Sequence, residues 1–394
     1  MLPSVGLLFL ATSGFVAPGA WHRTAAPRGH RIVSPIASLA PASIQTDADN
    51  STAAAAGGAA SATSLPPPSA RSPPLHPLRV LWRFSRPHTI VGSALCIPSL
   101  TCYAVPAGST LLSSPLWLGA AYALLPALLM NLYITGLNQL LDVDIDRVNK
   151  PQLPLASGDL SIASGVAIVL VSLAAALGLG WAHPLYATPA LQATLVGSAV
   201  LGTAYSLPPL RLKRFPLFAA ICIMGVRGGL INWGFQAHAS AVLAAAAATS
   251  AAVAPLRCWA PVAFFTLFGV VIALVKDVPD VRGDAMFGIR SFSVRFSPRR
   301  VLRAAVTLLC ATYGAAATAL GVGAVAALGG GEAAGGALVG ARRAFVALAA
   351  ALTARSVHRR ASDVPPTDSD AVYTFYMYLW KCFYTAYLLL PLAR

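Results

Sequence analysis

Two short segments hold most of the acidic residues whose spacing could do chemistry. The first, residues 136–158, reads GLNQLLDVDIDRVNKPQLPLASG, and the second, residues 276–295, reads KDVPDVRGDAMFGIRSFSVR. Asn138, Asp142 and Asp146 are four residues apart, as are Asp280 and Asp284, with Asp277 one turn earlier. Residues four apart share one face of a helix. Each segment is therefore expected to present a stripe of carboxylates, with Asp144 pointing elsewhere.

Carboxylate oxygens are ligands of hard cations, and Mg²⁺ commonly binds one or two carboxylates together with waters and substrate phosphates. A purely structural alternative is pairing within each segment, of Asp142 or Asp146 with Arg147 or Lys150 and of Asp280 with Arg282. Pairing explains one stripe but is a poor account of two stripes on one side of a membrane. The two segments together favour a magnesium site for a diphosphate that carries a long apolar tail.

The composition says what kind of chain positions these stripes. It has 394 residues and a net charge of +15, with 57% hydrophobic and only 10% charged residues. Soluble domains average about 25% charged residues, and disordered chains are less hydrophobic. A nucleic-acid-binding protein would need a solvated basic face, and no hydrophilic domain of this chain is large enough to offer one. The six cysteines are isolated and show no metal-binding spacing. An all-α polytopic membrane protein remains.

Apolar windows long enough to span a membrane predict about nine transmembrane helices. They lie near 88–106, 116–141, 161–181, 188–207, 215–236, 259–276, 301–322, 335–354 and 371–392. The eighth window is the weakest, because it contains Arg342 and Arg343. Segments 107–115, 182–187, 237–258 and 323–334 are expected to be the loops on one side of the membrane.

Basic residues gather in the other connections. They are Arg79, Arg83 and Arg86 before the first window, Arg147 and Lys150 after the second, Arg211, Lys213 and Arg214 after the fourth, Arg282, Arg290, Arg295, Arg299 and Arg300 after the sixth, and Arg355, Arg359 and Arg360 after the eighth. This asymmetry supports the helix number and orients the chain. Both acidic segments fall on the basic side, which is the stromal side if the protein belongs to a plastid.

The N-terminal residues have the composition of a targeting leader. Residues 1–14 resemble the apolar part of a signal peptide and are too short to span. Residues 15–78 are rich in Ala, Ser, Thr and Pro, contain arginines, and have no acid before Asp47, which is typical of a transit peptide. A two-part leader of this kind predicts a complex plastid, with residues 79–394 as the membrane domain. The alternative is a disordered Pro-rich tail.

The motif order resembles the UbiA superfamily of intramembrane prenyltransferases over residues 80–394. Within it, RFSRPHT, NQLLDVDID, NKPQLPLASG, TAYSLPPLRLKRFP and DVRGDAMFGI are similar to the homogentisate prenyltransferases of tocopherol and plastoquinone synthesis. The resemblance implies Mg²⁺-dependent transfer of a prenyl group, with loss of CO₂, from prenyl diphosphate to homogentisate. SRPHTIVG and GLNQL favour the phytyl branch of tocopherol synthesis over the solanesyl branch, and geranylgeranyl diphosphate is a further possible donor. The different-class alternative is a multi-pass transporter, with the acidic stripes as an ion path.

The resemblance also implies roles for individual residues. Metal ligands are expected at Asn138, Asp142, Asp146, Asp277, Asp280 and Asp284. Catalytic roles fall to Asp142, Asp146, Asp280, Asp284, Lys150 and Lys213, and substrate binding to Asn138, Arg86, Arg147, Tyr205, Arg214 and Arg227. Arg211, Arg299 and Arg300 are ranked lower, as basic residues that topology alone explains. The carboxylate of homogentisate requires a cation, for which Arg86 is the first choice, and Arg227 and Lys381 are the other charges inside expected spans.

Overall fold

A computed structural model describes residues 76–106, 114–247, 255–329 and 333–394. The signal-like segment 1–14 and residues 15–75 of the expected transit peptide lie outside the described residues. The structural description concerns the compact unit Pro68–Arg394. Its described residues form helices and connections without strands, and the predicted all-α class is confirmed.

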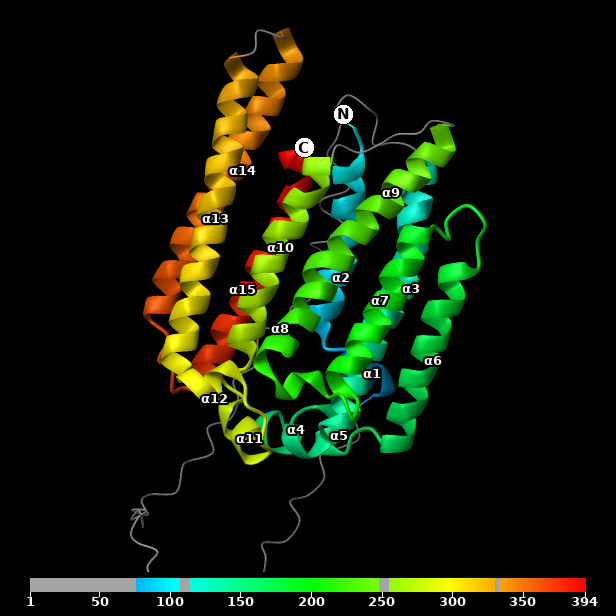
Figure 1. Ribbon diagram of the computed structural model, residues 1–394, viewed down its shortest axis with the longest axis vertical. Helices are drawn as coiled ribbons and strands as arrows, with labels where there is room; N and C mark the ends of the chain where they lie inside the picture. Colours follow the sequence, from blue (N-terminus) through cyan, green and yellow to red (C-terminus); the bar gives the residue numbers. More distant parts are fainter. Residues whose placement is uncertain (1–75, 107–113, 248–254, 330–332) are drawn as a thin grey trace, which may run out of the picture. The chain divides into compact units, whose positions relative to one another are not determined.

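Long helices coincide with every expected apolar window (Figure 1). They are α2 (Pro87–Ala104), α3 (Ser114–Leu141), α6 (Ile162–Trp181), α7 (Pro189–Ser206), the continuous run of α8 (Pro216–Ile223), η2 (Met224–Leu230) and α9 (Ile231–Ala247), then α10 (Pro255–Lys276), α13 (Pro298–Gly329), α14 (Ala333–Ser362) and α15 (Ser369–Leu389). A final 3₁₀ turn, η3, covers Leu390–Ala393.

Six of these stretches in the described part of the chain are long and apolar enough to cross a membrane, namely α3, α6, the α8–α9 run, α10, α13 and α14. Helices α2, α7 and α15 are not among them. Both α2 and α15 bury many side chains inside the bundle, and a helix covered by protein does not need an apolar surface all round. The number of nine spans therefore stays a prediction.

Two loops are shorter than expected. The window near 215–236 was expected to end in a loop over 237–258, but α9 continues to Ala247 and α10 begins at Pro255. The expected loop 323–334 is likewise reduced, because α13 reaches Gly329 and α14 begins at Ala333. Both segments are rich in alanine, the strongest helix former. The hydropathy windows end where the chain becomes less apolar, but the helices continue beyond those positions.

Short helices occupy the connections that carry the acidic and basic residues. They are α1 (Pro77–Phe84), α4 (Val143–Asn149), α5 (Pro154–Ser157), η1 (Leu212–Arg214), α11 (Val281–Met286) and α12 (Phe292–Phe296). In Figure 1, α1, α4, α5, α11 and α12 lie at the same end of the long helices. The fold thus gathers residues from distant parts of the sequence at one end of the bundle.

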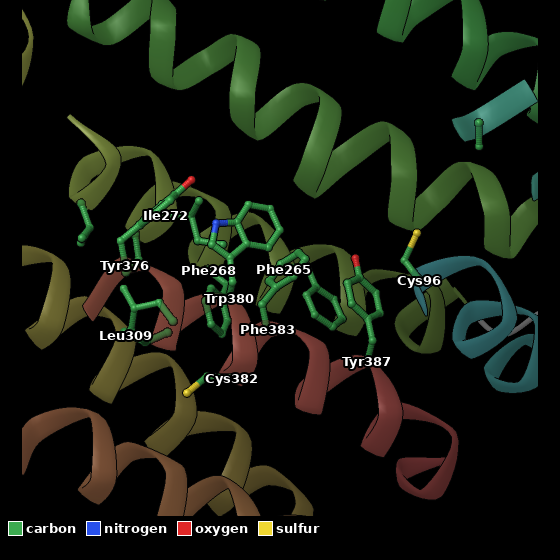
Figure 2. Packing of buried hydrophobic residues seen from close by; sticks show 14 of the residues in the cluster. Cys96, Phe265, Phe268, Ile272, Leu309, Tyr376, Trp380, Cys382, Phe383 and Tyr387 are labelled. Atoms are coloured by element: carbon green, nitrogen blue, oxygen red, sulfur yellow. The ribbon is translucent and has the colours of Figure 1, made fainter. Parts of the chain in front are cut away.

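An aromatic cluster joins α10 and α15 in the core. Figure 2 shows Trp380, Phe383 and Tyr387 along α15, beside Phe265 and Phe268. The rings of Phe265 and Tyr387 stack with centroids 3.8 Å apart, and Phe268 is fully buried. Large rigid rings of this kind bury much area and set the separation of the helices they join.

Candidate active site

The first acidic segment begins where α3 ends. Asn138 lies in the last turn of α3, while Asp142 adopts a non-helical backbone conformation and precedes α4. The expected single helical stripe through Asn138, Asp142 and Asp146 is therefore wrong, since the helix is interrupted at Asp142. The side chains of Asn138 and Asp142 are still in contact, because the Asn138 amide nitrogen donates to Asp142 Oδ2 at 3.0 Å.

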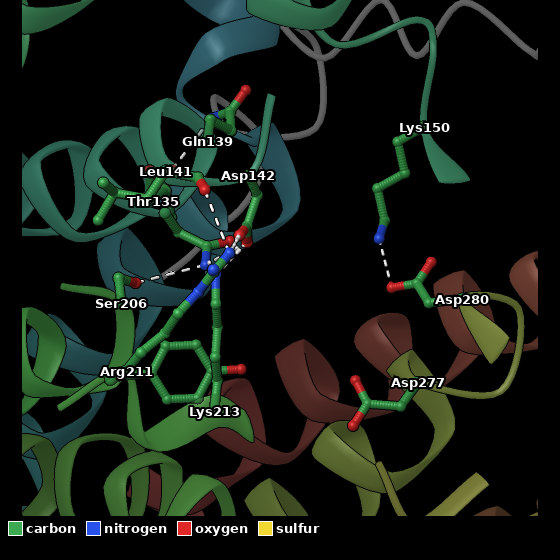
Figure 3. A network of polar contacts seen from close by, with 12 residues as sticks. Thr135, Gln139, Leu141, Asp142, Lys150, Ser206, Arg211, Lys213, Asp277 and Asp280 are labelled. Atoms are coloured by element: carbon green, nitrogen blue, oxygen red, sulfur yellow. Dashed lines mark hydrogen bonds and ion pairs between the residues drawn. The ribbon is translucent and has the colours of Figure 1, made fainter. Parts of the chain in front are cut away.

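Asp142 is held by two cations from the connection between α7 and α8 (Figure 3). Arg211 Nη2 lies 3.0 Å from Asp142 Oδ1, and Lys213 Nζ contacts Asp142 Oδ2. Burial lowers the pKa of Lys213, and the Asp142 carboxylate opposes that change. The sequence ranked Arg211 lower and did not predict its contact with Asp142, because that proximity depends on how α7 packs beside α3. Arg214, expected to bind substrate, is exposed.

The second acidic segment is docked directly on the first. Lys150 Nζ, at the end of α4, contacts Asp280 Oδ2 at the start of α11. The amide of Gly283 donates to Asn149 Oδ1 at 2.9 Å. A Cβ at Gly283 would lie 2.4 Å from the same oxygen, so only glycine allows this approach. The ion pair with Lys150 replaces the alternative pairing of Asp280 with Arg282, whose side chain is exposed.

Asp146 and Asp284 are buried and form no ion pair in the part of the chain that the structure describes. Their exposed fractions are 5% and 7%. Asp146 Oδ2 has no hydrogen-bond partner. Burial raises the pKa of Asp284 to about 7, with Asp277 and Asp280 adding to the rise. Burial also raises the pKa of Asp146, against the effect of Arg86 and Lys150.

These carboxylates fit a divalent cation by their chemistry. A buried carboxylate oxygen without a partner is costly and is a ready ligand. In the described ranges no three His, Cys, Asp or Glu side chains converge as a complete metal cluster. Mg²⁺ does not require one, because waters and substrate phosphates supply its remaining ligands. Asp146 and Asp284, with Asp142 and Asp280 beside them, are the residues that would hold it.

The other expected site residues differ in their contacts with the acidic segments. Arg147 pairs with Asp144 at 2.8 Å, and both side chains are largely exposed, so Arg147 does not face the acidic cluster. Asp277 Oδ1 lies 3.4 Å from Lys276 Nζ, and Lys276 also donates to the Tyr205 hydroxyl at 3.1 Å. Lys276 was missed in the sequence, although its position directly before Asp277 was a signal. Lys381 is exposed.

A cavity of about 190 Å³ lies among α2, α3, α7, the α8–α9 run, α10 and α15. Its polar lining includes Arg86, Asn138, Tyr205 and Lys276, so it begins beside the acidic segments. The walls are mainly apolar and include Met130, Ile134, Leu195 and Ile272. Aromatic and basic side chains also line the cavity, namely His88, Tyr376, Trp380 and Arg227. Charged groups thus adjoin an apolar cavity.

The fold and the site define a helical membrane protein in which buried charged side chains adjoin an apolar cavity. The UbiA prenyltransferase family matches residues 95–380. The chain belongs to this family, and the predicted superfamily is confirmed.

The chain is also similar to several named relatives and to a solved structure. It is 42% identical to homogentisate phytyltransferase 1 of Arabidopsis thaliana, over 80% of this chain and 76% of that one. It is 37% identical to homogentisate geranylgeranyltransferase of Hordeum vulgare, over 81% and 74%. Homogentisate solanesyltransferase of Arabidopsis thaliana is 38% identical over 59% and 58%. The fold is similar to a UbiA homolog from Archaeoglobus fulgidus bound to GPP and Mg²⁺, with a TM-score of 0.51, 17% identity, and coverage of 79% of this chain and 99% of that one.

Proposed function

We propose that the protein transfers a prenyl group from a prenyl diphosphate to homogentisate, and that phytyl is the preferred group. The observation that carries the proposal is the 42% identity to a homogentisate phytyltransferase over 80% of the chain. The similarity to the solanesyl enzyme extends over only 59% of the chain, which supports a phytyl or geranylgeranyl tail. The chloroplastic names of the plant relatives support a plastid membrane, and we place the acidic end toward the stroma.

The diphosphate would bind at the joined acidic segments. Lys213 and Lys150 are each held by a carboxylate, and a phosphate oxygen is an equivalent partner for an ammonium group. Asp146 and Asp284 would hold Mg²⁺, with Asp142 and Asp280 beside them. When bound, Mg²⁺ supplies neutralisation of charge on the leaving diphosphate. Solved UbiA homologs bound to GPP or DMAPP with Mg²⁺ support a prenyl diphosphate and a divalent cation as the ligands.

The apolar cavity would receive the reacting end of the prenyl tail. Cleavage of the allylic carbon–oxygen bond leaves a carbocation, which the electron-rich ring of homogentisate attacks before CO₂ is lost. Tyr376 and Trp380 line the cavity, and their aromatic faces can stabilise a cation. No activated nucleophile is required, so the chain's main contributions are positioning, charge stabilisation and exclusion of water.

An acceptor and donor matrix tests the proposal. Membranes with the full chain receive homogentisate or 4-hydroxybenzoate, together with phytyl, geranylgeranyl or solanesyl diphosphate. A methyl-phytyl-quinol from homogentisate and phytyl diphosphate, formed faster than the other products, is the expected result and places the reaction in tocopherol synthesis. Faster use of solanesyl diphosphate would move the protein to plastoquinone synthesis. Absence of product with every pair, from inserted protein, would overturn the proposal.

A further inference from the structure

Arg227 is a cation within a membrane-spanning stretch, and it lines the central cavity. It belongs to η2, a π-helical segment inside the span Pro216–Ala246. Its guanidinium lies 4.9 Å from the centre of the Trp380 ring. None of the ion pairs found in the described parts of the chain includes Arg227. The titratable groups near it include Tyr376, Tyr384, Tyr387, Cys96 and His88, none of which is a carboxylate.

An arginine in such surroundings is costly to maintain. Charges inside membrane spans are rare and usually serve a ligand, a partner or a transport path. The face of Trp380 supplies part of the stabilisation through a cation–π contact, but it uses none of the five N–H donors of the guanidinium. A planar carboxylate is the group that accepts from two of these donors at once.

A hydrogen-bond chain fixes the backbone at Arg227. The Asn232 amide nitrogen donates to the carbonyl oxygens of Arg227 at 2.8 Å and of Gly228 at 2.9 Å. Tyr387 donates from its hydroxyl to Asn232 Oδ1 at 2.9 Å. Asn232 is fully buried, and Tyr387 is 1% exposed. This chain satisfies carbonyls that a π-helical turn leaves out of register, and π-helical turns are frequent at functional sites.

Gly228 lets η2 approach α10 closely. A Cβ at this position would lie 2.0 Å from Thr266 Oγ1 and 2.5 Å from Thr266 Cα. The close packing on one side and the Asn232 side chain on the other leave the segment little freedom. Arg227 is therefore held in place against the cavity before any ligand enters.

Arg86, the first choice from the sequence for an acceptor carboxylate, lies in a different electrostatic environment. It precedes α2 with φ 53° and opposes the rise in the pKa of Asp146, so it acts on the acidic end. Arg227 faces the Trp380 ring, and none of the ion pairs of the described residues includes it. Both arginines lie near His88 and line the same cavity, but Arg86 also acts on Asp146.

We propose that Arg227 binds the carboxylate of the aromatic acceptor, and that Asn232 and Tyr387 are positioning residues for it. The inference rests on the proposed function, because it takes an aromatic carboxylate as the second substrate. It assigns the site of that carboxylate to η2, away from the site of the donor diphosphate. It also explains why a half-buried arginine, which forms no ion pair among the described residues, faces the same cavity as the prenyl tail.

The test uses the full chain in lipid vesicles and measures the KM for homogentisate and the KM for the donor separately. Arg227→Met is expected to raise the KM for homogentisate roughly 10- to 100-fold, the effect of losing a hydrogen-bonded charge, and to change the KM for the donor less than about 2-fold. Inhibition by 2-methylhydroquinone, which has a similar ring without a carboxylate, should be unchanged. Tyr387→Phe removes one hydroxyl and is expected to raise the KM for homogentisate by roughly 3- to 10-fold.

The matched control is Arg343→Met. Arg343 lies in α14, donates to the Gly323 carbonyl at 3.2 Å, and does not line the cavity. Both KM values should stay at the wild-type level in this variant. An unchanged KM for homogentisate in Arg227→Met, or an equal rise for both substrates, would overturn the assignment.

Calorimetric titration with homogentisate separates this inference from the proposed function. Binding to wild type that is lost in Arg227→Met supports the site, even if no prenylated product forms. Where wild type does not bind homogentisate, or Arg227→Met binds it equally well, the assignment fails. The thermal transition of each variant shows whether it is folded. Arg227→Lys, which keeps the charge, should recover part of the binding.

Discussion

The two acidic segments follow the same plan with different partners. In each, the first carboxylate of the pair spaced four residues apart contacts a lysine, Lys213 at Asp142 and Lys150 at Asp280. The carboxylate four residues later, Asp146 or Asp284, is buried without an ion pair among the described residues.

The difference lies in where the cations originate. Asp142 receives Arg211 and Lys213 from the connection between α7 and α8, whereas Asp280 receives Lys150 from the first acidic segment itself. The first pairing joins the acidic segment to the bundle, and the second joins the two acidic segments to each other. Of the two carboxylates spaced four residues apart in each segment, one thus maintains the architecture, and the other has no ion-pair partner among the described residues.

Removal of the metal should have the largest effect. Treatment with EDTA is expected to reduce prenyl transfer to background, because both segments would lose the cation that neutralises the leaving group. Excess Mg²⁺ should restore the rate, which is measured by product formation in membranes. Full activity in EDTA would remove the reason for proposing a metal site between the segments.

Replacement of the unpaired carboxylates by asparagine should have the next largest effect. Asp146→Asn and Asp284→Asn are expected to lower turnover by about 10²–10³-fold, the usual cost of removing one electrostatic contact to a transition state, with little change in thermal stability. The control is Asp144→Asn in the same helix, whose side chain is exposed. Comparable losses in Asp144→Asn would show that the effect does not come from a cation site.

Breaking the link between the segments should cost stability. Lys150→Met leaves Asp280 buried without its partner and is expected to lower the free energy of unfolding by about 3 kcal/mol, measured by denaturation in detergent. The double variant Lys150→Met/Asp280→Asn should recover most of this stability without recovering activity. A double variant as unstable as the single one would contradict the ion pair as the cause.

A methyl group at the contact between α4 and α11 should have a smaller effect. Gly283→Ala places Cβ against Asn149 and is expected to cost about 1–3 kcal/mol, with a lower kcat because the two segments move apart. Asn149→Ala in the same chain should relieve the clash and return part of the stability. Thermal unfolding of the single and double variants measures both effects, and an unaffected single variant would show that α11 adjusts freely.

The smallest effect is expected at the exposed pair. Arg147→Ala removes the partner of Asp144, and both side chains are more than half exposed. Surface ion pairs contribute little, so stability should change by less than about 0.5 kcal/mol and turnover by less than about 2-fold. A large loss of turnover would return Arg147 to the site, where the sequence had placed it.

Much of this architecture could be predicted from the sequence. Apolar windows locate every long helix, because membrane spans require long apolar stretches. The motifs around Asp142 and Asp280 identify the family, and the parity of the basic connections brings both segments to one end. Helix ends such as Ala247 could not be located, since hydropathy measures polarity and not hydrogen bonding.

Some partners of the charges are local, and others depend on tertiary structure. Arg147 pairs with Asp144 and Lys276 with Asp277 within one segment. The sequence offered pairing within a segment as the structural alternative for Asp142 and Asp280 as well, but these contact Lys213 and Lys150 from distant segments. Arg227 is an isolated arginine in the sequence, and only the packing of η2 against α10 and α15 places it beside Trp380 at the cavity. The sequence by itself determined which residues carry charge and which segments are apolar enough to form the long helices. Which charges meet was decided by the packing of the helices, because electrostatic contacts act over a few ångströms and those distances exist only in the folded bundle.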